Sequence, residues 1–128
     1  MMEFISVEEP SILQSIKLKL GLTKEQMPFD HDIILSINSA FMTLYQLGIG
    51  FNNNAIHISS VNEKWEDYGI SNSYHQWIKD YIYMKVRLAF DPPSSSFVLK
   101  SFEDQIKELE WRIEVERDNE LLDLENEE

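Results

Sequence analysis

The chain has 128 residues, of which 43% are hydrophobic and 12% aromatic, enough to build one core without metals or crosslinks. It has no cysteine, which excludes a disulfide framework, a cysteine-ligated zinc site and a thiol nucleophile. Its net charge is −12, of which residues 1–100 carry −3 and residues 101–128 carry −9, so we expect it to repel nucleic-acid duplexes and anionic membranes.

The first ten residues are acidic where a secretory signal would be basic. No apolar stretch approaches the roughly 20 residues that a membrane helix needs, so a soluble protein made in the cytoplasm is expected. A first helix is predicted from about residue 12 to 20. Ser11 and Gln14 have the spacing of a capping box, and Gly21 stands where a left-handed residue ends a helix.

A second helix is predicted at about 31–47 from apolar residues spaced 3, 4 and 3 apart. Asp30 or Asp32 is expected to accept backbone N–H bonds at its start, and Gly48 and Gly50 to end it. The apolar stripe consists of Ile34, Ile37, Phe41 and Leu44.

Residues 51–72 lack a sustained period, and we expect an irregular loop. Ile56 and Ile58 alternate around His57, which is weak evidence for a short strand. One helical turn is expected to pack Trp65 on the body.

A third helix is predicted to follow Ser73 as its cap and to end at Asp91, because Pro92 and Pro93 cannot continue it. Its apolar and aromatic residues lie on more than one face, which predicts a central helix buried on two sides. They are Tyr74, Trp77, Ile78, Tyr81, Ile82, Met84, Val86, Leu88 and Phe90.

The three serines 94–96 offer a cap for a fourth helix that is predicted to run at least to Arg117. It has a heptad-like stripe, with charged residues on its other faces. The stripe consists of Leu99, Phe102, Ile106, Leu109 and Ile113.

The sequence therefore predicts an all-α fold: a compact bundle of about four helices, with a long amphipathic C-terminal helix and an irregular loop between the second and third helices. We expect one domain at residues 1–117. Residues 118–128, which hold no basic residue, are expected to form a flexible acidic tail.

No arrangement of residues indicates catalysis or a cofactor, and we expect neither an enzyme nor a metal protein. His31, His57 and His75 are scattered, and Asp30 with Asp32 beside His31 is better interpreted as a solvated helix start than as a metal site. The aromatic run Tyr74, Trp77, Tyr81 and Tyr83, with nearby Lys79, Lys85 and Arg87, leaves base stacking as a weaker alternative to core packing or subunit contact.

The segment 81–113 resembles the signature stretch of the phage head-tail connector family, also called head completion or adaptor proteins. The resemblance lies in a helix that ends at Asp91, Pro92 and Pro93, then serines, then a long final helix. The final helix contains the similar motif Glu108, Leu109, Glu110, Trp111 and Arg112. Upstream segments are similar as well, so the likeness covers nearly the whole chain.

The resemblance implies a structural protein of the virion, located at the head-tail interface and assembled in the cytoplasm of the bacterial host. Its members form a ring that matches the twelvefold portal, extends the DNA channel and docks the tail or a stopper protein. The implied partners are the portal protein, neighbouring copies and the tail or stopper protein. DNA would pass through the ring without sequence-specific binding, and acidic walls suit that passage.

We predict that the fourth helix contacts the portal or a neighbouring subunit through Trp111, Arg112, Val115 and Leu121, since Trp and Arg dominate interface hot spots. The alternative is that Trp111 only covers the edge of the bundle. Two other functions stay open. The first is an acidic phage-encoded DNA mimic that inhibits a host nucleic-acid-binding protein, and the second, ranked last, is an enzyme with a novel site.

Overall fold

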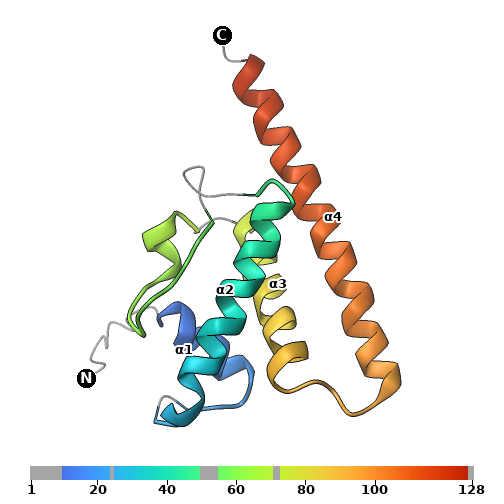
Figure 1. Cartoon of the computed structure of the whole chain (residues 1–128). Coiled ribbons are helices and arrows are strands. Elements are labelled where there is room, and N and C mark those ends of the chain that lie inside the picture. Colours follow the sequence, from blue (N-terminus) through green and yellow to red (C-terminus); the bar gives the residue numbers. More distant parts are fainter. Residues whose placement is uncertain (1–9, 24, 50–54, 71–72, 127–128) are drawn as a thin grey trace, which may run out of the picture.

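The computed structural model describes residues 10–23, 25–49, 55–70 and 73–126. These residues form helices and connecting segments with no strand among them, which confirms the all-α prediction (Figure 1). The elements in chain order are α1 (Ile12–Lys19), η1 (Met27–Phe29), α2 (Asp30–Gln46), η2 (Trp65–Tyr68), α3 (Ser73–Phe90) and α4 (Ser96–Asn126).

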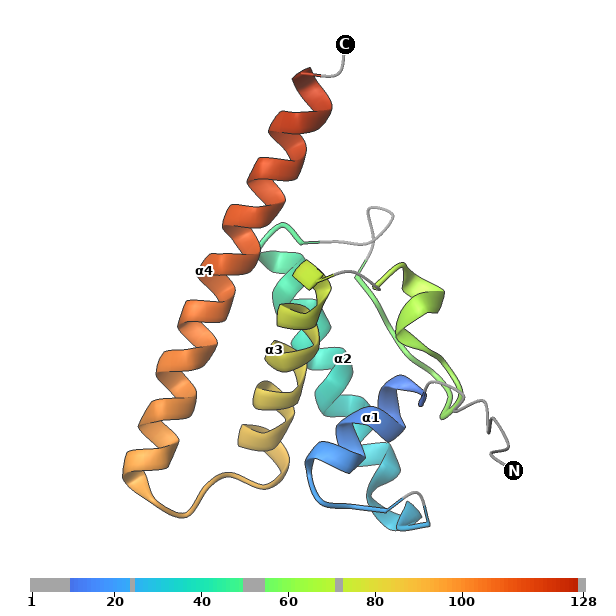
Figure 2. The ribbon, with the colours of Figure 1, turned by 180° about the vertical axis from the view of Figure 1, so that it is seen from behind.

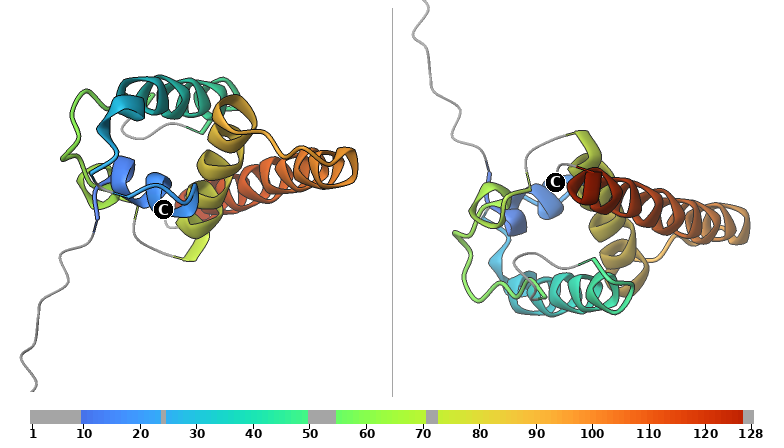
Figure 3. Two further views of the ribbon diagram at one scale, coloured as in Figure 1. Left: turned by 90° about the horizontal axis from the view of Figure 1, so that it is seen from below. Right: turned by 90° about the horizontal axis from the view of Figure 1, so that it is seen from above.

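Helix α3 is the centre of the fold. It packs against α2 on one side and against α4 on the other, and it lies between them in the views along the bundle (Figure 3). Ile78, Tyr81, Ile82 and Val86 are fully buried, so apolar side chains leave α3 in more than one direction. The prediction of a central helix buried on two sides is confirmed.

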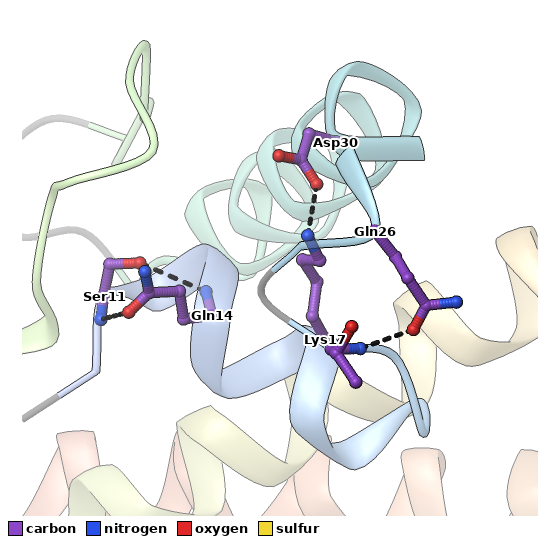
Figure 4. Close-up of polar contacts among 6 residues, drawn as sticks. Ser11, Gln14, Lys17, Gln26 and Asp30 are labelled. Carbon is purple, nitrogen blue, oxygen red and sulfur yellow. Dashed lines mark hydrogen bonds and ion pairs between the residues drawn. The ribbon is translucent and has the colours of Figure 1, made fainter. Parts of the chain in front are cut away.

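Helix α1 begins and ends as its sequence predicts. The Ser11 hydroxyl accepts the Gln14 N–H at 3.1 Å, and the Gln14 side chain accepts the Ser11 N–H, which completes the capping box (Figure 4). At the other end Gly21 has a φ of 83°, which an L side chain rarely adopts. The Lys17 carbonyl then accepts the N–H of Leu22 at 2.8 Å, in addition to the N–H of Leu20 at 3.1 Å.

A buried ion pair joins α1 to the start of α2. The Lys17 side chain is 2% exposed, and its Nζ lies 2.7 Å from Oδ1 of Asp30 (Figure 4). The expected capping role of Asp30 is therefore wrong. No side chain caps α2, and the Asp30 carboxylate faces the Lys17 ammonium instead.

The loop before α3 packs its two isoleucines without a strand. Ile56 and Ile58 are buried and His57 is exposed, as the alternation predicted, but no strand is formed by the described residues 55–59. The Asn38 side chain of α2 bonds the backbone of this segment. It accepts the Ile58 N–H at 2.8 Å and donates to the Ile58 carbonyl at 2.9 Å.

The expected helical turn around Trp65 is confirmed as η2. The indole is buried, donates to the Ser15 hydroxyl at 2.9 Å and meets the Phe41 ring edge-on at 6.2 Å between centroids. Trp65 thereby fixes the loop to both α1 and α2.

One helix boundary differs from the sequence-based expectation, and another lies within it. Helix α3 begins at Ser73, so this residue is the first helical residue rather than the cap. Helix α4 continues past Arg117 to Asn126, through the acidic segment (Figure 2). The division of the chain at residue 117 stays a prediction.

Replacing Asp30 by Ala should lower the free energy of unfolding by about 3 kcal/mol, because the buried Lys17 ammonium would lose the carboxylate that lies 2.7 Å from it. Urea unfolding measures the change. The matched control is Asp104→Ala, which removes the exposed Lys100–Asp104 pair and should cost less than about 1 kcal/mol. Equal losses in the two variants would contradict the structural role of the buried pair.

Candidate interface on the last helix

Helix α4 packs on the body through one face only. Ile106 and Ile113 are buried seven residues apart, and Leu99, Phe102 and Leu109 on the same stripe are partly buried. This confirms the predicted heptad-like stripe as the contact with α3. Among the described residues, α3 is the helix with which α4 makes most of its contacts.

Several polar and cation–π contacts hold α4 in position, and the first joins it to the middle of α3. The buried Tyr81 hydroxyl donates to Oε2 of Glu110 at 2.9 Å. Burial raises the pKa of Tyr81 above its ordinary value of 10.0, and the hydrogen bond to the Glu110 carboxylate raises it further. The partly buried Glu110 carboxylate therefore contacts α3.

The second contact involves Trp77, which lies one turn before Tyr81 on α3. The Arg112 guanidinium stacks over the Trp77 ring of α3 at 5.8 Å, and its Nε and Nη2 donate to Oε1 of Glu108 at 3.1 and 2.7 Å. A cation held over an aromatic face in this way is attracted by the ring's electrons. Arg112 therefore serves contacts within the chain, although its side chain remains 45% exposed.

The third contact joins α4 to the end of α2. Arg117 Nη1 donates to the Gly48 carbonyl at 2.9 Å, across 69 residues of sequence. Gly48 has a φ of 90°, and a Cβ at this position would lie 2.1 Å from Arg117 Nη1. The glycine therefore both ends α2 and makes room for the arginine. Gly50, the other glycine expected to end α2, lies outside the described residues.

The face of α4 that points away from α3 carries an apolar strip. Trp111, Val115 and Leu122 are 65%, 37% and 56% exposed. They are spaced 4 and 7 residues apart, so they lie on one side of the helix. We call these three residues the outer strip. Large apolar side chains grouped on an exposed face are typical of interaction surfaces.

The outer strip extends onto a part of α4 that stands clear of the body. Figure 2 shows the C-terminal end of the helix projecting past the other helices. Residues 118–126 hold four carboxylates, Asp118, Glu120, Asp123 and Glu125, and no basic residue. The projecting end is therefore acidic with apolar residues between the charges.

The structure brings two of the four predicted interface residues together. Trp111 and Val115 lie side by side on the outer strip, whereas Arg112 lies about a quarter-turn away and contacts Trp77. The side chain of Leu121 is outside the described residues. Leu122 was missed, although its place three helical turns after Trp111 could have identified it.

The other candidate sites gain no support. The described residues contain no group of three or more His, Asp or Glu able to hold a metal ion. Asp30, part of the imagined Asp-His-Asp site, pairs with Lys17. Two of the four aromatic residues of the base-stacking alternative are occupied within the fold, because Tyr81 is buried and the Arg112 guanidinium covers Trp77. None of the helices within the described residues is long and apolar enough to cross a membrane.

Comparison with known protein families identifies a match. A family model described as "Phage connector protein" matches residues 12–120, which include α1, α2, α3 and most of α4. No curated protein and no solved structure matches the chain.

Stability should fall as the pH rises above about 10, because the raised pKa means that the folded state favours the protonated Tyr81 hydroxyl. This contribution is complete below the unfolded pKa of 10.0 and is lost as the pH rises through the higher folded value. Tyr81→Phe should lower the free energy of unfolding by about 1–2 kcal/mol at pH 7 and should flatten the alkaline decline.

Unfolding in urea at pH 7 to 11 measures both effects. In Tyr81→Phe a smaller alkaline loss of stability should remain, because burial also raises the pKa of Tyr68, to about 12. Parallel pH curves for the wild type and Tyr81→Phe would contradict the assigned role of the Tyr81–Glu110 bond.

Proposed function

Because the chain belongs to the phage connector protein family, we propose that it acts as a structural, non-enzymatic head-tail connector in a tailed bacteriophage. In this role it forms a ring under the portal, extends the DNA channel and docks the tail or stopper protein. The match over residues 12–120 is the observation that carries the proposal. The place of action is the head-tail interface of the virion, after assembly in the cytoplasm of the host.

The charge of the chain suits a protein beside moving DNA. A wall with a net charge of −12 per copy repels phosphates, so DNA would slide past it without being held. This argument supports passage through the ring and not sequence-specific binding.

The outer strip supports the structural role. Trp111 and Val115 expose apolar surface that no described element covers, and Leu122 extends it. Arg112, which stacks on Trp77 about a quarter-turn from the strip, is 45% exposed and can supply a charged rim, and Leu121 completes the proposed contact set. We assign these residues to contacts with a neighbouring copy or with the portal protein.

The alternative, a DNA-mimic inhibitor, is favoured by one observation, the dense carboxylates of residues 101–128. A mimic of a duplex would need carboxylates at phosphate-like spacing over its whole surface. The first 100 residues hold 8 basic and 11 acidic residues, so most of the body lacks that charge.

Light scattering tests the connector proposal directly. The solution mass is measured for the protein alone and then after mixing with the portal protein of the same phage. A ring, or co-elution with the portal, is expected. A monomer that persists at high concentration and ignores the portal would overturn the proposal and favour the inhibitor.

Trp111→Ala should weaken assembly by about tenfold or more while changing the free energy of unfolding by less than about 1 kcal/mol, because the indole lies mostly outside the fold. Light scattering and urea unfolding measure the two effects. Leu18→Ala is the matched control, since Leu18 on α1 is 64% exposed, and it should leave assembly unchanged. If Trp111→Ala lowered the free energy of unfolding as strongly as it weakened assembly, the interface assignment would be contradicted.

A further inference from the structure

A second exposed apolar face lies on α2. From residue 33 to 46 this helix carries no Asp, Glu, Lys or Arg. Its solvent side instead exposes Leu35 at 54% and Met42 at 50%, seven residues apart on one line of the helix. An exposed helix face of this length without charge is unusual in a chain of which 27% is charged. We call this surface the α2 face.

The α2 face borders a groove of about 420 Å³ between α2 and α3. Small side chains from both helices leave the space open, and Lys85 supplies its positive charge. The lining includes Leu35, Ser36, Ser39, Lys85, Leu88 and Ala89. A groove of this kind accepts one large side chain, and its serine hydroxyls can accept a hydrogen bond from an indole N–H.

The α2 face and the outer strip belong to different sides of one subunit. Helix α3 separates the two helices that carry them (Figure 3). Two unlike surfaces that fit each other join copies head to tail, and such contacts close into rings when the rotation between copies allows it. A contact between like surfaces would produce only pairs.

The charges near the two surfaces favour contact between the α2 face and the outer strip over contact between two outer strips. Residues 101–128 carry a net charge of −9, so two α4 helices side by side would repel each other. The α2 face has no carboxylate between residues 33 and 46 to repel α4, and Lys85 in the adjoining groove attracts it.

We propose that the outer strip of one copy packs on the α2 face of the next copy, with Trp111 seated in the groove between α2 and α3. This inference rests on the proposed ring and adds which two surfaces form it. Met42 then lies against the α4 helix of the neighbour, near Val115. The occupant of the α2 face is a second copy of this chain.

Because the chain has no cysteine, single cysteines report this contact without background. Met42→Cys and Val115→Cys are purified separately, mixed, and treated with a short thiol-specific cross-linker. The mixture should give a cross-linked dimer that neither variant gives alone, and the double variant should give a ladder of larger products. A mixture of Leu18→Cys and Val115→Cys is the control and should give no dimer.

A charge placed on the α2 face provides a second measurement. Met42→Glu should stay folded, because residue 42 is half-exposed, and should weaken assembly by about tenfold or more, because its carboxylate would face the acidic α4. Leu18→Glu is the matched control and should assemble normally.

The outcomes separate this inference from the proposed function. A ring that forms without a cross-link between positions 42 and 115, and that tolerates Met42→Glu, overturns the pairing and leaves the connector role intact. Cross-links of Val115→Cys to itself, or to the portal only, also overturn the pairing. A chain that neither assembles nor binds the portal overturns both.

Discussion

The packing of α3 between α2 and α4 is the constraint on which the rest of the structure depends. Ile78, Ile82 and Val86 of the central helix are completely buried. Helix α4, in turn, presents a buried stripe to α3 on one side only. The apolar residues on its far side, Trp111 among them, therefore stay exposed unless another molecule covers them. The fold that stabilises the single chain leaves surface available for assembly.

The helices were predictable from sequence because their signals are local. Apolar spacing, the capping box at Ser11 and the double proline after Asp91 each act within a few residues. The contacts that join the helices were not predictable in this way. The Lys17–Asp30 pair and the Arg117 bond to Gly48 link residues 13 and 69 positions apart, and only the folded chain brings them together. The local sequence therefore predicted that Asp30 caps α2, whereas in the folded chain its carboxylate pairs with the buried Lys17 ammonium.

The candidate site was only partly predictable for a similar reason. Trp111 was predicted as an interface residue because a large aromatic residue off the heptad stripe does not face the core, and in the structure it is exposed. Arg112 was chosen as its neighbour in sequence, but adjacent helical residues point in different directions, and Arg112 stacks on Trp77. The α2 face was missed, because Leu35 looks like one more core residue in a helix that is already rich in them. Only the absence of charge from residue 33 to 46 marks it in the sequence.

The central claim is that assembly covers the outer faces of α2 and α4, and hydroxyl-radical footprinting tests it most directly. Methionine and tryptophan side chains oxidise readily when they are exposed. In the assembled protein Met42 and Trp111 should both be protected relative to the free chain, whereas Met27, which is 66% exposed in η1, should remain as reactive as before. Equal oxidation of Met42 and Trp111 in the free and assembled protein would contradict the account.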